Sequence, residues 1–146
     1  MDSAYWPDYK SSVKEIRNYL DKINSSDIID FKRLFLGGFS QGGGVAVQMA
    51  LTGDIPACGF VVVAPGGGMI DEPEKWQSLI DESKNHELRG MIIRGTEDLA
   101  IPRDKLHDLV KMLNNNGIPC KFLEYPGLGH WYPPDLVDIV TSSNWF

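Results

Sequence analysis

The chain alternates short apolar runs with longer amphipathic stretches, and this alternation strongly limits the folds it can adopt. Apolar runs typical of strands cover residues 33–38, 58–64, 90–93 and 121–125. The second run, Cys-Gly-Phe-Val-Val-Val-Ala, is apolar on both faces of a strand. Strands of this kind are covered on both sides, as they are in parallel sheets.

Helical patterns separate these runs. The first has Val13, Ile16, Leu20 and Ile23 at helical spacing, with Ser12 and Glu15 placed as a capping box. Further helices are expected over residues 41–51, stopped by Gly53, from Pro73 through Ile80, from Pro102 to Gly117, and over residues 135–140. The resulting order, α-β-α-β-α-β-α-β-α, predicts an α/β fold of about four parallel strands with helices on both faces.

Length and charge narrow the classes of function. The 146 residues are expected to form a single domain, 1–146, that needs no metal or disulfide for its core. Lys and Arg number 14 against 20 Asp and Glu, a net charge of −6, and no cluster of basic residues interrupts this balance. Nucleic acids and anionic membranes are therefore poor candidates as partners.

Other features favour a cytoplasmic protein. Cys58 and Cys120 each begin an apolar run, so we expect two free thiols and a reducing compartment. The first residues lack the basic start and apolar segment of a secretory signal, and no apolar run has the length of a membrane span.

The sequence Gly38-Phe39-Ser40-Gln41-Gly42 lies between the first predicted strand and a helix of small residues. In this position a G-x-S-x-G pattern predicts a nucleophile elbow, a tight turn that presents the serine hydroxyl above the sheet. The alternative is an ordinary turn serine that caps the helix. The strand before Ser40 and the glycines around it favour the elbow.

The loops after the third and fourth strands supply an acid and a base. Asp98 lies in the third loop beside Glu97, a competing acid, and His130 lies in the fourth. The histidines His86 and His107 do not follow strands. Ligands of doubly wound sheets bind beyond the carboxyl ends of the strands, and the order serine, acid, histidine is that of α/β-hydrolases. We therefore expect His130 to take the proton of Ser40 and Asp98 to orient His130.

Several neighbours are candidates for binding the substrate. The backbone N–H of Gln41, at the start of a helix, is expected to stabilise an oxyanion. Met69, Trp76, Trp131 and Tyr132 are candidates for a substrate pocket, with simple packing as the alternative. The glycine run at 66–68 lacks a phosphate-binding lysine and is interpreted as a flexible loop near the site.

The Ser40 motif, the Gly95-x-x-Asp98-x-x-x-Pro102 loop and the Gly129-His130 pair together resemble the phospholipase/carboxylesterase family of α/β-hydrolases, which includes acyl-protein thioesterases. The resemblance runs from about residue 12 to the last helix. It implies hydrolysis of small-molecule esters or thioesters by Ser40, Asp98 and His130, without a metal or an organic cofactor. Dienelactone hydrolases are a near alternative, but they usually carry a cysteine where this chain has Ser40.

The chain departs from that family before the elbow. Family members place several strands there, and one of the following loops supplies a second oxyanion donor. Only 39 residues precede Ser40, and they hold no glycine-rich loop. Loss of one donor costs about 10² to 10³ in rate. The first strand, with Leu34, Phe35 and Leu36, would also become an exposed apolar sheet edge open to a second copy or a partner chain. The alternative function is thus a catalytically impaired subunit that binds a partner through this edge.

Overall fold

The structure is a computed structural model that describes residues 8–26, 29–67, 70, 72–82 and 87–142. Its parallel sheet has the strand order β1-β2-β3-β4. The strands are β1 (Phe35–Phe39), β2 (Gly59–Val63), β3 (Arg89–Gly95) and β4 (Cys120–Tyr125). The helices are α1 (Tyr9–Asn24), α2 (Gln41–Thr52), α3 (Pro73–Glu82), α4 (Arg103–Asn115) and α5 (Leu136–Ser142), with a short 3-10 helix, η2 (Phe31–Arg33). The predicted α/β class and order of elements are confirmed.

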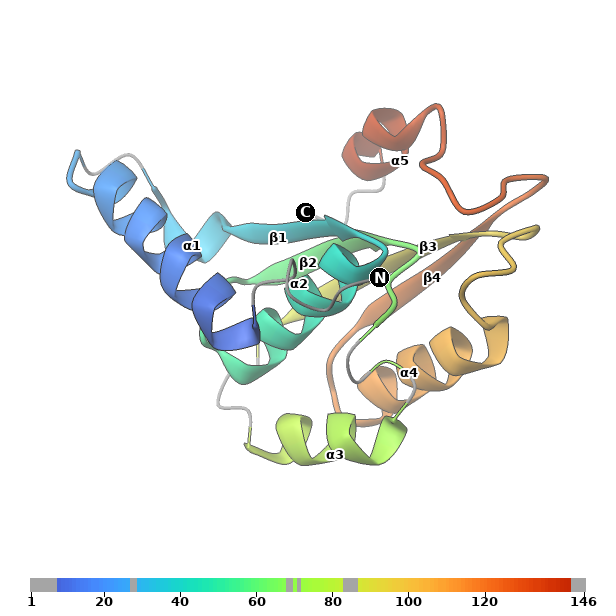
Figure 1. Cartoon of the computed structure of the whole chain (residues 1–146), viewed down its shortest axis with the longest axis horizontal. Helices are drawn as coiled ribbons and strands as arrows, with labels where there is room; N and C mark the ends of the chain where they lie inside the picture. The colour runs from blue at the N-terminus through green and yellow to red at the C-terminus, as the bar shows by residue number, and fades with distance from the viewer. Residues whose placement is uncertain (1–7, 27–28, 68–69, 71, 83–86, 143–146) are drawn as a thin grey trace.

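Helices cover both faces of the sheet, as predicted (Figure 1). Helices α2, α3 and α4 pack on one face, where alternate strand residues such as Phe60, Val62 and Ile92 meet Leu51, Trp76 and Leu109 in the largest core cluster. Alternation along a strand sends neighbouring residues to opposite faces. The other face therefore carries Val63, Met91 and Ile93, which pack against Leu136 and Ile139 of α5.

Helix α1 packs at the side of the sheet, near β1 and α2. Its Val13 forms a third cluster with Met49 and Ile55. The predicted capping box is wrong, because the helix begins earlier, at Tyr9. Its N-cap is Asp8, whose side chain accepts a hydrogen bond from the backbone N–H of Ser11 at 2.8 Å.

The first strand is displaced from its predicted range of 33–38. Asp30 caps η2 by accepting from the N–H of Lys32 at 3.0 Å, so residues 31–33 are helical and the strand starts at Phe35. Within the described sheet β1 has β2 as its one neighbour and is an edge strand, as predicted. Leu34 and Leu36 are half-buried against the α1 cluster, so this edge exposes less apolar side chain than the sequence suggested.

Both cysteines are free thiols, in line with the prediction. Cys120 is buried, and Cys58 is half-buried with its Sγ donating to the carbonyl of Leu34 at 3.3 Å. In the part of the chain that the structure describes, no helix combines the length and the hydrophobicity needed to cross a bilayer.

Candidate active site

Ser40 occupies a sharp turn between β1 and α2. Its backbone has φ 52° and ψ −124°, a conformation that non-glycine residues rarely adopt. Neighbouring backbone groups hold the turn: the N–H of Ser40 donates to Val63 O at 3.0 Å, and its carbonyl accepts from Gly43 and Gly66 at 3.0 and 2.9 Å. Backbone strain of this kind persists only where the surroundings fix it, and it is common at functional sites.

The glycine before the turn is required by close packing. A Cβ atom on Gly38 would overlap the backbone carbonyl of Gly42 in the first turn of α2. The strand and the helix therefore approach each other as the two arms of a nucleophile elbow do. The side chain of Ser40 makes no capping hydrogen bond to α2, which argues against the alternative of a simple N-cap serine.

The hydroxyl of Ser40 instead begins a chain of hydrogen bonds across the top of the sheet. Its Oγ lies 3.0 Å from Nε2 of His130, and Nδ1 of His130 lies 2.9 Å from Oδ2 of Asp98. The side chain of His130 is 31% exposed while that of Asp98 is fully buried. The three residues thus lie in a row that runs from a partly accessible hydroxyl to a buried carboxylate.

The surroundings of Asp98 favour its ionised form. Burial by itself would raise the pKa of this carboxyl, but hydrogen bonds from His130 and from the backbone N–H groups of Ala100 and Ile101 outweigh it, and the pKa is lowered. Oδ1 accepts from those two N–H groups at 2.8 and 3.2 Å. An ionised carboxylate can only accept, so Nδ1 of His130 carries the proton and Nε2 is left to accept from Ser40.

Residues 95–101, which we call the acid loop, accept hydrogen bonds from the buried side chain of Arg94. This residue is 6% exposed. Its guanidinium donates to the carbonyls of Gly95 at 2.8 Å, Asp98 at 2.5 Å and Ile101 at 3.1 Å. Arg94 was not among the predicted site residues. The available signal was a charged residue directly after the apolar run Met91-Ile92-Ile93, since charged residues are almost never buried without partners.

The acid loop is also joined to the loop that carries His130. The N–H of Thr96 donates to Tyr125 O and the N–H of Glu97 to Leu128 O, both at 3.0 Å. The N–H of Gly127 donates to the hydroxyl of Thr96 at 2.9 Å. These bonds fix the two loops relative to each other, and with them the positions of Asp98 and His130.

The competing residues lie elsewhere. Glu97 is exposed, whereas Asp98 faces His130. His107 is exposed on α4, where its ring lies 6.3 Å from that of Phe122. His86 falls outside the described residues.

The ring of Phe39 links His130 to two further aromatic rings. The ring of Phe39 lies 4.9 Å from that of His130, 4.6 Å from that of Tyr132 and 6.0 Å from that of Trp131. Trp131 and Tyr132 are 64% and 40% exposed, so both predicted pocket residues lie at the surface near the site. Phe39 was not predicted, although its place directly before Ser40 was the available signal.

Of the other two predicted pocket residues, Trp76 and Met69, the structure describes Trp76 alone. Trp76 is 1% exposed in the largest core cluster, beneath α2 and beside α4, so it packs in the core rather than along an open pocket. The reason is that α3 packs against α2 and α4, and Trp76 lies on the buried side of α3. Met69 lies outside the described residues.

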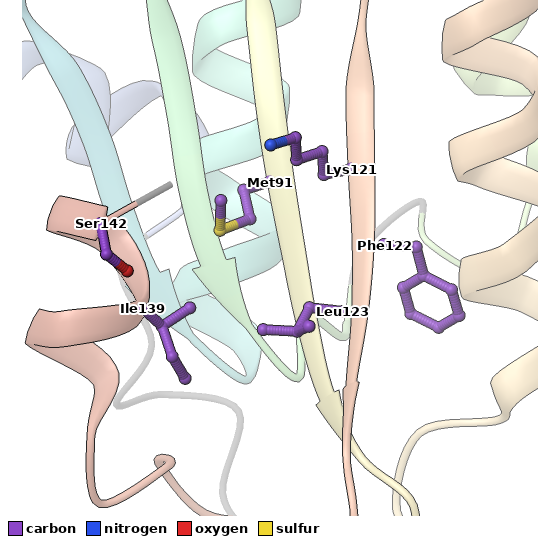
Figure 2. A pocket seen from close by; sticks show the side chains of 6 residues that line it. All are labelled: Met91, Lys121, Phe122, Leu123, Ile139 and Ser142. Carbon is purple, nitrogen blue, oxygen red and sulfur yellow. The ribbon is translucent and has the colours of Figure 1, made fainter. Parts of the chain in front are cut away.

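Two grooves flank α5 on its face of the sheet. One, of about 290 Å³, is lined by Phe39, Val63, Tyr132 and Leu136 among others, and so adjoins the aromatic rings of the site. The second, of about 410 Å³, lies between α5 and strands β3 and β4, where Met91, Leu123 and Ile139 converge (Figure 2). Its lining includes none of Ser40, Asp98 and His130.

Gln41 is the first residue of α2. The N–H groups of a first helical turn have no acceptor within their helix, so the amide of Gln41 makes no intrahelical hydrogen bond. Among the described residues, no three His, Cys, Asp or Glu side chains are grouped so that they could hold a metal ion.

Comparison with known proteins determines the family. A sequence model of the phospholipase/carboxylesterase family matches residues 7–143. The chain belongs to this family. One curated phospholipase/carboxylesterase relative is acyl-protein thioesterase 1 of Gibberella zeae, which is 26% identical over 133 residues. That match covers 91% of this chain and 55% of the relative, so the chain spans about half the length of the curated protein.

Solved structures agree with the phospholipase/carboxylesterase fold. An uncharacterized protein from Bacillus cereus superposes with a TM-score of 0.76 at 24% identity, over 95% of this chain and 43% of that one. Acyl-protein thioesterase 2 of Zea mays superposes with a TM-score of 0.68 at 18% identity, over 97% of this chain and 67% of the maize protein. At these identities the likeness concerns the fold alone.

Proposed function

We propose that this chain is a serine hydrolase that cleaves carboxylic esters or thioesters through an acyl-enzyme. The observation that carries the proposal is the unbroken hydrogen-bonded row from Ser40 Oγ through His130 to Asp98 Oδ2, with contacts of 3.0 and 2.9 Å. A serine hydroxyl is a weak nucleophile unless an adjacent base takes its proton. Membership of the phospholipase/carboxylesterase family supports the same chemistry.

The proposed reaction begins with attack of Ser40 Oγ on the acyl carbonyl carbon. The proton of the hydroxyl moves to Nε2 of His130, and the buried carboxylate of Asp98 stabilises the imidazolium through the Nδ1–H. The carbonyl oxygen becomes an oxyanion, which accepts a hydrogen bond from the N–H of Gln41. When the tetrahedral intermediate collapses, the bond to the leaving oxygen or sulfur breaks and His130 returns the proton to it.

Hydrolysis of the acyl-enzyme repeats these steps with water. His130 takes a proton from the water as it attacks the acyl carbon, and Ser40 leaves with that proton while the carboxylic acid is released. The chain needs no metal or organic cofactor for this sequence of steps. Trp131 and Tyr132, exposed beside Phe39, are the proposed contacts for the substrate.

Labelling with a fluorophosphonate probe tests the proposal, because such probes react with activated serines. We expect one label per chain at Ser40, located by mass spectrometry, and none in Ser40→Ala. Ser25→Ala, which alters an exposed serine after α1, is the matched control and should label like the wild type. A folded wild-type protein that takes up no label would refute the hydrolase proposal. If Ser40 does label, the rates of hydrolysis of an ester and a thioester with the same acyl group would identify the preferred leaving group.

A second candidate function is that of a binding subunit that acts through β1. It is favoured by the edge position of this strand, the exposure of Gly37 and the apolar groove of about 290 Å³ beside it. An unpaired edge strand is a template for pairing with another chain. We propose that a second copy or a partner covers this edge. Light scattering after size exclusion at high micromolar concentration should show self-association, and a strictly monomeric protein contradicts pairing between copies.

We also propose a cytoplasmic location. It rests on the composition of the chain and on the two free cysteines, which fit a reducing compartment. Localisation of the full protein with a fluorescent tag tests it, and a secreted product would contradict it.

A further inference from the structure

Arg94 is a buried cation. Its hydrogen bonds go to backbone carbonyls, and the carboxylate of Glu124 lies beyond hydrogen-bond distance. Its guanidinium donates to carbonyls at the start, the middle and the end of the acid loop: Gly95, Asp98 and Ile101. A guanidinium carries five N–H donors in a rigid plane, a geometry that lysine cannot reproduce. One side chain therefore fixes the path of the whole loop.

The same bonds fix the direction of the Asp98 carboxylate. The carbonyl of Asp98 is bound by Arg94 at 2.5 Å, and its Oδ1 accepts from the N–H groups of Ala100 and Ile101. Ile101 is itself tied to Arg94 through its carbonyl. With these groups occupied, Oδ2 is the oxygen that remains for His130, at 2.9 Å. We infer that Arg94 is the positioning residue of the acid: it holds the acid loop so that Oδ2 of Asp98 meets Nδ1 of His130.

The charge of Arg94 is accommodated by Glu124. The two residues lie in register on β3 and β4, with Nη1 and Oε1 4.0 Å apart. Glu124 also binds Arg103, the first residue of α4, through two hydrogen bonds of 2.6 and 3.0 Å. Arg94 and Arg103 therefore share one carboxylate. Arg94 also donates hydrogen bonds to the acid loop, whereas the hydrogen bonds observed for the Arg103 side chain go to Glu124.

This difference provides a matched pair of variants. Arg94→Met removes the positive charge together with the bonds to the acid loop. Arg103→Met removes a positive charge and the two hydrogen bonds to the same Glu124 but leaves the acid loop intact. Arg94→Lys keeps the charge and loses the planar fork. Circular dichroism and thermal unfolding show whether each variant folds.

Two measurements are made on each variant. The first is the rate of fluorophosphonate labelling at Ser40. This readout rests on the proposed function. The second is the downfield proton resonance of the Nδ1–H of His130, assigned by its loss in His130→Gln. It reports the bond to Asp98 and does not depend on turnover, so the inference can fail or succeed separately from the hydrolase proposal.

We expect Arg94→Met to label about 10²-fold more slowly, the loss expected when a catalytic group is displaced by about 1 Å, and to lose the downfield resonance. Arg94→Lys should fall between Arg94→Met and the wild type in both measurements. Arg103→Met should keep the resonance and label close to the wild-type rate.

Three results would overturn the inference. The first is a folded Arg94→Met that keeps both the resonance and the labelling rate of Arg103→Met. The second, if Arg94→Met does not fold, is a folded Arg94→Lys with wild-type behaviour in both measurements. The third is failure of both Arg94 variants to fold, because Arg94 would then support the core rather than the site. If the wild type does not label, the hydrolase proposal fails, and the resonance alone decides the role of Arg94.

Discussion

The Oγ atom of Ser40 lies 3.0 Å from the Nε2 atom of His130, although 90 positions separate them in the chain. The two residues follow β1 and β4, which are the opposite edges of the described sheet. Their loops meet because all four strands are parallel and end on the same side. Asp98, which follows β3, reaches the far nitrogen of the same imidazole.

Removal of the imidazole should disable the site while leaving the fold intact. We expect His130→Ala to slow fluorophosphonate labelling of Ser40 by about 10² to 10⁴, the usual contribution of a general base. His107→Ala, an exposed histidine on α4, is the control and should label at the wild-type rate. Equal labelling of the two variants would exclude His130 as the base.

Gly95→Ala should separate the acid loop from the loop of His130. A Cβ atom at Gly95 would overlap the backbone carbonyl of Leu128, which cannot move without breaking the contacts between the loops. We expect a lower unfolding temperature and slower labelling at Ser40. At Gly37, another strand glycine, an added Cβ would lie 3.6 Å from Val61 O, an ordinary contact. Gly37→Ala should therefore match the wild type, and similar losses in both variants would contradict the explanation.

The lowered pKa of Asp98 predicts a pH-dependent contribution to stability. A carboxyl whose pKa is lower in the folded state stabilises the fold above its unfolded value, 3.8, and loses this contribution as the pH falls through the folded value. The difference in unfolding free energy between the wild type and Asp98→Asn should thus be largest near neutral pH. It should shrink below pH 3.8. Urea titrations across this range measure it, and a constant difference would contradict the prediction.

The thiols should be poorly reactive in the folded protein. Burial raises the pKa of Cys120 to about 12, and burial also raises the pKa of Cys58. Because the thiolate is the reactive form, iodoacetamide should modify Cys120 only after unfolding and should modify the half-buried Cys58 slowly. Mass spectrometry of native and urea-treated samples distinguishes the two sites. Rapid modification of Cys120 in the native state would contradict the packing described around it.

Local sequence signals located the elements more reliably than their boundaries. The capping box at Ser12 and Glu15 fitted the pattern of a helix start, but Asp8 offered an earlier cap that the helix uses. Trp76 shows a similar limit. Its sequence position did not reveal whether it faces a pocket or the core, because that depends on how α3 packs against α2 and α4.

The acid was also ambiguous in the sequence, where Glu97 and Asp98 are neighbours. The structure separates them by direction: Glu97 is exposed and Asp98 faces His130. This direction is set by backbone hydrogen bonds of the acid loop, including those from Arg94. Bonds to backbone carbonyls leave no residue pattern, so the position of Arg94 directly after a buried apolar run was its one signal in the sequence.

The sequence by itself determined the α/β architecture and the tight turn at Ser40, because these depend on local periodicity and on residues within a single turn. Only the tertiary structure decided which acid meets His130, that Arg94 fastens the acid loop, and that Trp76 belongs to the core. The physical reason is that these features depend on contacts between residues far apart in the sequence. Hydrogen bonds such as that between Ser40 and His130 join residues 90 positions apart, and their geometry is fixed by how the strands pair.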